Sequence, residues 1–317
     1  MAPRIKLFFR EPEIDTNEPI VRGLAPVEGF EVEIVGSMKE ADAWDSSFAA
    51  RLLEFDSGPP RVSIPAFPNR KFRQSYIYVK TSAGIETPKD LAGKRIAVRG
   101  WANTAGVWAR GALTHHHGVD LSGVRWVCRR RDETMFPEGA ANIEHAVADP
   151  AGRLPTLDEM LLSGAVDAVI DADVPPSITR RDPRARRLFR DSMEEEKRYF
   201  RASGIFPISH LVTLRRDFVD RHPEAPLALL KAFRAARDLA FDAIEGSDPR
   251  VVVLSWARQL LDEQRALMGE SYFSYEVARN RLPLEAMTRY AREQWITQRL
   301  IGVDELFDPS TLNDADD

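Results

Sequence analysis

The side chains best suited to holding an organic anion lie in residues 64–79, IPAFPNRKFRQSYIYV. Pro65 and Pro68 each remove a backbone donor and fix φ, so we expect a rigid kink rather than a regular strand. Three cations follow at Arg70, Lys71 and Arg73. Arginine can hold a carboxylate through two parallel hydrogen bonds, so this segment is a candidate anion clamp. The alternative is a solvated basic loop beside a strand.

A second segment, residues 204–216 (GIFPISHLVTLRR), repeats the Phe-Pro arrangement and adds a histidine, His210. Histidine is the side chain whose unperturbed pKa lies nearest to neutral pH, which suits a general acid. The alternative is a structural histidine that is bonded to a backbone partner. Two proline-kinked strands, one leaving a lobe and one returning to it, are what a two-lobed clamshell requires. We therefore expect both segments to cross between lobes.

A predicted helix over residues 41–55 brings polar side chains to its N-terminus. Its large apolar side chains recur at spacings of four, four and three, which predicts one buried face. They are Trp44, Phe48, Leu52 and Phe55. Asp45, Ser46 and Ser47 lie near the start of this helix, where free backbone N–H groups attract anions. An ordinary N-cap would explain these residues as well.

A second predicted helix begins within residues 101–118, WANTAGVWARGALTHHHG, and is capped by Asn103 or Thr104. We expect these two side chains to face a ligand at the helix entrance. The three histidines at residues 115–117 point in different directions in the last turn, so their spacing does not match a helical metal site. We predict neither a metal nor a cofactor, because the chain also lacks a P-loop and a dinucleotide fingerprint.

The elements that position these residues alternate between strands and helices. Strands are expected at residues 4–9, 30–35, 95–98, 124–128 and 166–170. Helices are expected at residues 20–24, 87–93, 156–164 and 227–244, with more in residues 251–307. Strand–helix–strand units at these spacings indicate an α/β protein with parallel pairing. A connection at residues 134–155 and a basic, mostly solvated stretch at residues 180–190 complete the prediction.

The length of the chain favours two lobes. It has 317 residues, of which 44% are hydrophobic and 29% are charged. Single hydrophobic cores stop growing near roughly 250–300 residues. We expect residues 1–80 to form the first part of lobe 1 and residues 81–204 to form lobe 2. Residues 205–317 would then return to lobe 1 and add helices that cover it.

Charge and cysteine content exclude several classes of protein. A net charge of −5 and a pI near 5.8 argue against nucleic-acid binding. No apolar run reaches the roughly 20 residues of a membrane-spanning helix, and the acidic residues near the N-terminus do not fit a secretory signal. The single cysteine, Cys128, excludes an internal disulfide. We expect a cytoplasmic protein that binds a small anion, with homo-oligomer formation left open.

The chain resembles the 4,5-dihydroxyphthalate decarboxylases, a family built on the type II periplasmic-binding-protein fold. The resemblance runs through nearly the whole chain in collinear order. It rests on the two proline-kinked segments, the crossing TSAGIETPKDLAGKRIAV, the stretch TLDEMLLSGAVDAV, the run VWARG and Asn280-Arg281. It implies an α/β clamshell of two mixed sheets flanked by helices. It also implies a cytosolic enzyme whose hydroxylated aromatic diacid binds between the lobes and loses one carboxylate as carbon dioxide.

The resemblance also implies a set of polar site residues. By position they are Arg70, Arg73, Ser75, Ser46, Ser47, Thr104, Arg110 and His210, to which the helix entrance adds Asn103. We expect Arg73 to anchor a carboxylate through charge-assisted hydrogen bonds and His210 to supply the proton. Asp132, Glu133 or Asp173 would accept a phenolic proton.

The chain departs from the family in loops that we expect to face the cleft. They are residues 9–12, RRRDE at 129–133, Asp173 and YFSYE at 272–276. A related lyase that acts on a different aromatic acid is therefore one alternative. Another alternative is a non-catalytic cytosolic protein that binds a small anion, because the same clamshell would serve it equally well.

Overall fold

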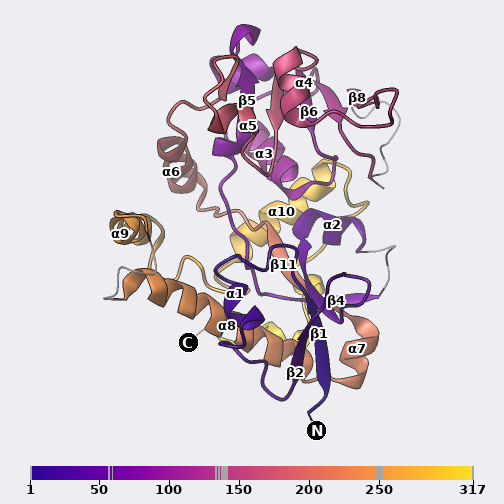
Figure 1. Cartoon of the computed structure of the whole chain (residues 1–317), viewed down its shortest axis with the longest axis vertical. Helices are drawn as coiled ribbons and strands as arrows, with labels where there is room; N and C mark the ends of the chain where they lie inside the picture. The colour runs from indigo at the N-terminus through magenta and orange to yellow at the C-terminus, as the bar shows by residue number, and fades with distance from the viewer. Residues whose placement is uncertain are drawn as a thin grey trace.

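The computed structural model describes residues 2–55, 58, 60–132, 134, 136, 142–246 and 253–315. Its strands form two mixed sheets, which confirms the predicted α/β class. In Figure 1 the first sheet and its helices occupy the lower part of the molecule, and the second sheet occupies the upper part.

The first sheet follows the order β2-β1-β3-β11-β4. Its strands are β2 (Glu31–Ile34), β1 (Arg4–Phe8), β3 (Ala43–Ser47), β11 (His210–Arg215) and β4 (Arg61–Ile64). Strand β1 pairs in parallel with β2 and β3, whereas β11 runs antiparallel to β3 and β4. Because β11 comes from the second proline-kinked segment, the last third of the chain returns to complete this sheet.

The second sheet follows the order β10-β5-β9-β6-β7-β8. Its strands are β10 (Ala185–Arg187), β5 (Ile77–Lys80), β9 (Ala168–Ile170), β6 (Arg95–Val98), β7 (Arg125–Cys128) and β8 (Asn142–His145). Successive apolar residues alternate between two clusters, with Ile96 and Val98 in one and Ala97 in the other. A strand buried on both faces in this way needs helices on both sides of its sheet.

Ten α-helices surround the sheets in the described part of the chain. They are α1 (Glu18–Val21), α2 (Phe48–Leu53), α3 (Thr104–His115), α4 (Leu157–Ser163), α5 (Pro176–Thr179), α6 (Ser192–Ser203), α7 (Arg216–Arg221), α8 (Ala225–Glu245), α9 (Ala257–Met268) and α10 (Arg281–Glu293). Helix α4 matches the helix predicted at residues 156–164: a capping box at Thr156 begins it, and Gly164, where φ is 81°, ends it. Local capping signals therefore set the bounds of this helix.

Helix α10 joins the two halves of the molecule. It packs against α2 beside the first sheet and against α3 beside the second, and Figure 1 shows it between the two sheets. The approach to α3 is close, because a Cβ atom added at Gly111 would lie 2.2 Å from Tyr290 Cδ2. We had predicted that the C-terminal helices cover the first lobe. Helix α10 also packs against α3, beside the second sheet.

The predicted helix over residues 41–55 is wrong in its first half. Residues Ala43–Ser47 form strand β3, and the helix α2 begins only at Phe48. Strand β3 pairs with β1 on one side and β11 on the other, so a sheet position overrides the local pattern. The spacing of Trp44 and Phe48 imitated a helix because a short strand passes directly into one.

Strands β8 and β10 and helix α6 are among the elements that were not predicted. Strand β8 lies within the expected connection at residues 134–155, and β10 and α6 lie in and after the basic stretch. Strands β8 and β10 are the two edges of the second sheet. Their sequences, NIEH and ARR, are polar because an edge strand buries little of its surface, and such strands give a weak apolar signal.

The structure places the two proline-kinked segments side by side. Arg70 and Ile208 form an antiparallel bridge, and the Asn69 carbonyl accepts hydrogen bonds from the backbone N–H groups of Ser209 and His210 at 2.8 and 3.1 Å. The predicted boundary after residue 80 differs from the sheet membership, since β5 already pairs within the second sheet. The passage from the first sheet to the second therefore runs through residues 65–76.

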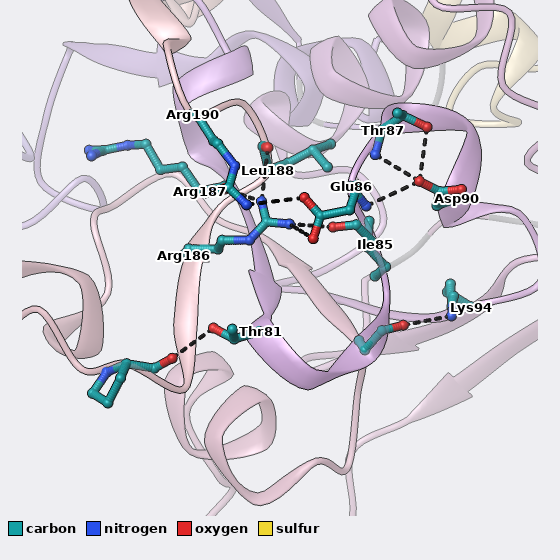
Figure 2. Close-up of polar contacts among 12 residues, drawn as sticks. Thr81, Ile85, Glu86, Thr87, Asp90, Lys94, Arg186, Arg187, Leu188 and Arg190 are labelled. Carbon is teal, nitrogen blue, oxygen red and sulfur yellow. Dashed lines mark hydrogen bonds and ion pairs between the residues drawn. The ribbon is translucent and has the colours of Figure 1, made fainter.

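Two arginines of the basic stretch that we had expected to be mostly solvated form ion pairs at the edge of the second sheet. Figure 2 shows Arg186 and Arg190 converging on Glu86, at 3.0 and 3.2 Å. Arg186 is half-buried and also donates to the Ile85 carbonyl at 2.5 Å. These contacts tie the edge strand β10 to residues 81–94, the segment that follows β5.

Candidate active site

The candidate site lies where the first sheet meets the start of α3. Ser47 at the end of β3 pairs with His210 at the start of β11. The Ser47 hydroxyl lies 2.7 Å from the hydroxyl of Thr104, the first residue of α3, and Thr104 Oγ1 also accepts the Ala49 N–H at 3.0 Å. Because α3 follows β6, the carboxyl ends of parallel strands from both sheets meet here. In open α/β sheets such ends are where ligands bind.

His210 is held by an aspartate that the sequence did not identify as its partner. His210 Nδ1 lies 3.1 Å from Asp45 Oδ2, and Asp45 Oδ1 accepts the Arg10 N–H at 3.0 Å. The Asp45 side chain is completely buried, whereas that of His210 is 16% exposed. Asp45 can therefore accept a hydrogen bond from Nδ1–H, while Nε2 makes no hydrogen bond with any described residue.

Arg73 is a buried cation that forms no ion pair with a described residue. It is 5% exposed, its Nη2 donates to Ser209 Oγ, and its Nε has no partner in the described part of the chain. Burial lowers the pKa of Arg73 to about 10, so the guanidinium remains charged at neutral pH. Arg73 is therefore bonded to the residue that precedes His210 in the chain. We call Arg73, Ser209, His210 and Asp45 the cleft cluster.

Arg70 has a different environment, although it lies three residues away. Its Nη1 donates to Asn280 Oδ1 at 2.8 Å and to the Tyr272 carbonyl at 3.2 Å, and its Nη2 donates to the Phe206 carbonyl at 2.9 Å. Its guanidinium carbon lies 4.4 Å from the centre of the Phe206 ring. These contacts join the proline-kinked segments to the C-terminal part of the chain. Arg70 is thus held by three acceptors of the protein, and its Nε has no partner among the described residues.

Ser75 and Arg110 are also engaged by other residues. The N–H and hydroxyl of Ser75 both donate to Glu196 Oε1, at 3.0 and 2.5 Å. Arg110 Nε donates to Gln294 Oε1 at 2.7 Å, and its Nη2 donates to the Trp101 carbonyl at 2.6 Å. The structure therefore does not bring these two predicted substrate ligands into the cleft cluster.

Ser46 and Asn103 remain beside the cleft cluster. Ser46 is half-buried in β3, opposite Leu211, and its hydroxyl makes no hydrogen bond with a described residue. Asn103 caps α3, with Oδ1 accepting the Gly106 N–H at 3.4 Å. Together with Ser47 and Thr104, these side chains form the polar surroundings of the helix start.

A second group of charges follows the strands of the second sheet. Arg99, after β6, donates from Nε to Asp171 Oδ1 at 2.7 Å and from Nη2 to Asp173 Oδ2. The sequence singled out Asp173 but missed Arg99. Arg99 could have been identified from the sequence, because it is a charged residue directly after a buried parallel strand. Asp132 accepts the Ala102 N–H at 2.7 Å, and residue 133 lies outside the described residues.

The described residues contain no cluster of histidine, cysteine or acidic side chains that could hold a metal ion. The histidines of the HHH run have separate neighbours: His115 Nε2 lies 2.7 Å from Glu293, and His117 Nε2 lies 3.8 Å from Glu195. Within the same described ranges, no helix has the length and apolar character needed to cross a membrane.

Solved structures share this fold at low sequence identity. A putative periplasmic sulfonate-binding protein from Methylobacillus flagellatus aligns over 98% of this chain and 92% of its own, with a TM-score of 0.54 and 17% identity. The aliphatic sulphonate-binding protein of Escherichia coli gives a TM-score of 0.53 at 12% identity, over 97% and 98% of the two chains. The desulfurization enzyme DszB gives 0.52 at 16% identity over 98% of each. They confirm the predicted clamshell fold.

Sequence comparison is more specific than the fold. No family model matches the chain. A 4,5-dihydroxyphthalate decarboxylase from Pseudomonas putida is 37% identical over 145 residues, which is 45% of this chain and 56% of that protein. A 4,5-dihydroxyphthalate decarboxylase from Comamonas testosteroni is 31% identical over 261 residues, which is 80% of this chain and 77% of that protein. The chain therefore belongs to the 4,5-dihydroxyphthalate decarboxylase family.

Proposed function

We propose that this protein is a carboxy-lyase that releases carbon dioxide from a hydroxylated aromatic dicarboxylate, with 4,5-dihydroxyphthalate as the first substrate to test. The curated relatives carry that substrate in their names. The observation that supports the proposal most strongly is the cleft cluster. A buried guanidinium without an ion pair to any described residue is bonded to Ser209, and the following residue, His210, has an Nε2 that makes no hydrogen bond with the described residues.

The reaction needs a proton at the ring carbon that carries the departing carboxylate. In 4,5-dihydroxyphthalate a hydroxyl lies para to that carbon and donates electrons as the carbon is protonated. The electron pair of the bond to the carboxylate then returns to the ring, and carbon dioxide leaves. The net change is uptake of one proton and loss of one carbon dioxide, which gives 3,4-dihydroxybenzoate. No oxidant or reductant is required.

The cleft cluster has a group for each part of this reaction. Arg73 would hold the carboxylate that remains on the ring, because charge-assisted hydrogen bonds are the stronger kind. His210 would deliver the proton from Nε2, while Asp45 keeps the proton on Nδ1 and stabilises the imidazolium form. Ser46, Ser47, Asn103 and Thr104 would bind around the ring.

The aspartates beside Arg99 complete the proposal. Either Asp171 or Asp173 would accept the phenolic proton as the ring becomes quinonoid, and Arg99 would balance the charge of both carboxylates. Asp132 and Glu133 are the alternatives from the neighbouring loop. We also propose a cytoplasmic location, which fractionation of the producing cells would test.

Incubation with 4,5-dihydroxyphthalate tests the proposal. We expect release of carbon dioxide and an equal amount of 3,4-dihydroxybenzoate, both lost in a His210→Ala variant. Phthalate, which lacks the hydroxyls, should bind without reacting. Tight binding of the whole hydroxybenzoate panel without product would favour a binding protein. Turnover of another aromatic acid, with none of 4,5-dihydroxyphthalate, would favour a related lyase.

A further inference from the structure

A second cavity, apart from the cleft cluster, lies between α3 and the end of α10. Its volume is about 480 Å³, within the range of about 300–1,000 Å³ that is usual for small-molecule sites. Its wall includes Trp101, Arg110, Thr114, Trp126, Gln294 and Trp295. The resemblance implied a site role for Arg110 alone among these wall residues, and the proposed reaction uses none of them.

Aromatic rings dominate the wall. Trp101 meets Trp126 edge to face at 5.5 Å and lies almost parallel to Trp295 at 6.5 Å. Trp295 has a φ of 59°, in the left-handed region that a non-glycine residue rarely adopts. Such strain persists where the surrounding structure holds it, and it concentrates at ligand sites. Three indoles in this arrangement offer stacking surfaces for a flat ring.

The cavity also contains an uncompensated positive charge. Arg110 lines the cavity, is 2% exposed and forms no ion pair with a described residue; its Nη1, which lies on the side of Gly106, has no partner among those residues. Its guanidinium carbon lies 3.9 Å from the centre of the Trp101 ring. Burial lowers the pKa of Arg110 to about 9, so the group stays charged at neutral pH. An anion in the cavity would therefore meet a cation that the protein itself does not neutralise.

The outer part of the wall carries the opposite charge. Asp120 and Glu293 line the cavity and are exposed, whereas Arg110 is buried. With the cation inside and the carboxylates outside, the cavity favours a ligand whose single carboxylate points inward. A second carboxylate would lie near the acidic side chains. The cavity thus discriminates between aromatic acids by the number of their carboxylates.

We propose that this cavity is a second ligand site that takes an aromatic monocarboxylate. The identity of the ligand rests on the proposed function, because loss of carbon dioxide converts a dicarboxylate into such a molecule. The site would therefore bind the product class and reject the substrate class.

The position of the cavity connects it to the candidate active site. Arg110 lies six residues beyond Thr104 on α3, or roughly 9 Å along the helix axis. Gln294 joins the two elements, since its carbonyl accepts the Trp101 Nε1–H at 2.7 Å and its Nε2 donates to the Val107 carbonyl at 3.1 Å. A ligand held between α3 and the end of α10 would restrain the helix whose first residue contacts Ser47. We expect such a ligand to slow turnover.

Calorimetry with 3,4-dihydroxybenzoate tests the site. The Arg73→Met variant lacks the cleft cation and so isolates the second cavity. We expect it to bind one equivalent of 3,4-dihydroxybenzoate, and phthalate more weakly. Adding Thr114→Phe, which fills the cavity from an exposed wall residue, should abolish this binding. Adding Thr179→Phe, at an exposed threonine of α5 outside the cavity, should leave it unchanged. Thermal melting would establish that each variant is folded.

Three results would overturn the proposal: no binding to Arg73→Met, equal binding after Thr114→Phe is added, or tighter binding of phthalate. Kinetics give an independent readout. Product inhibition of the native enzyme should include a component that substrate does not relieve, and Thr114→Phe alone should remove that component. Binding at the cavity without any release of carbon dioxide would contradict the proposed function and leave the second site standing. Turnover without binding at the cavity would contradict the second site and leave the proposed function standing.

Discussion

Arg70 and Arg73 are neighbours in the sequence, equally buried, and yet opposite in their surroundings. Arg70 donates to three acceptors of the protein, from Phe206, Tyr272 and Asn280. Arg73 has one such acceptor, on Ser209. The Nε of each side chain is without a partner among the described residues. Burial lowers the pKa of both, to about 9 for Arg70 and about 10 for Arg73.

The difference shows that burial and charge alone do not identify an anion site. A guanidinium with three acceptors in the protein serves the fold, whereas one with a single acceptor keeps more donors available to a ligand. Arg110, with two acceptors, lies between Arg70 and Arg73. Each prediction below separates the fold role from the ligand role.

The largest effect is expected for His210, the proposed acid of the cleft cluster. His210→Ala should lower kcat by about 10³-fold, the scale of a general acid, with little change in melting temperature. Steady-state kinetics and thermal denaturation would measure the two. The exposed His116→Ala is the control and should keep native activity. Native turnover by His210→Ala would remove this residue from the mechanism.

Arg70 should matter for stability rather than for catalysis. Arg70→Met leaves three buried acceptors without a donor, so we expect the free energy of unfolding to fall by about 3 kcal/mol. Denaturant unfolding would measure it, with kcat per folded molecule unchanged. Lys71→Met, at an exposed neighbour without a hydrogen bond to any described residue, is the matched control. A selective loss of substrate affinity in Arg70→Met would erase the contrast with Arg73.

Arg73 should show the reverse behaviour. Arg73→Met removes a charged hydrogen-bond donor worth about 2 kcal/mol, or roughly 30-fold in kcat/KM. Most of this loss should appear as a higher KM, because the carboxylate that stays on the ring is held before and during the reaction. Kinetics over a range of substrate concentrations, with Lys71→Met beside it, would show the split. An unchanged KM with a large loss of stability would show that Arg73, like Arg70, stabilises the fold and does not bind substrate.

Asp45 is expected to act through His210. Asp45→Asn should lower kcat by about tenfold, because asparagine no longer holds the ring through an anionic acceptor. Asp42→Asn is a matched control, since Asp42 Oδ2 also accepts a backbone N–H, from Lys6 at 3.0 Å, and does not contact His210. Steady-state kinetics would measure both, and the same loss of kcat in both variants would show a general effect of charge.

The smallest expected effect concerns Glu196, which holds Ser75 near Arg73. Burial raises the pKa of Glu196 above its ordinary value of 4.5. The folded protein therefore binds a proton more tightly than the unfolded chain, and stability falls as pH rises from 4.5 through the raised pKa. Glu196→Gln should lose this fall, whereas Glu194→Gln, exposed on the same helix, should retain it. Parallel stability curves for native protein and Glu196→Gln would contradict this.

Local signals were sufficient for many elements of the fold. The capping box at Thr156, the box formed by Thr87 and Asp90, and the buried runs of β6, β7 and β9 predicted their elements correctly. These signals work because a helix end or a buried strand is fixed by residues within a few positions. The prediction failed for strand β3 because its partners are distant in the sequence. Asp45, for example, forms hydrogen bonds with Arg10 and His210, which are 35 and 165 residues away.

The sequence by itself determined that the chain is an α/β clamshell with two proline-kinked, basic or histidine-bearing segments. Tertiary structure decided which of their charges are available. Arg70 donates to acceptors as far away in the sequence as Asn280, 210 residues distant. Arg73 donates to the Ser209 hydroxyl, 136 residues distant. A guanidinium looks the same in any sequence, because its role depends on how many of its donors the folded chain satisfies, and that number is set by contacts no local pattern encodes.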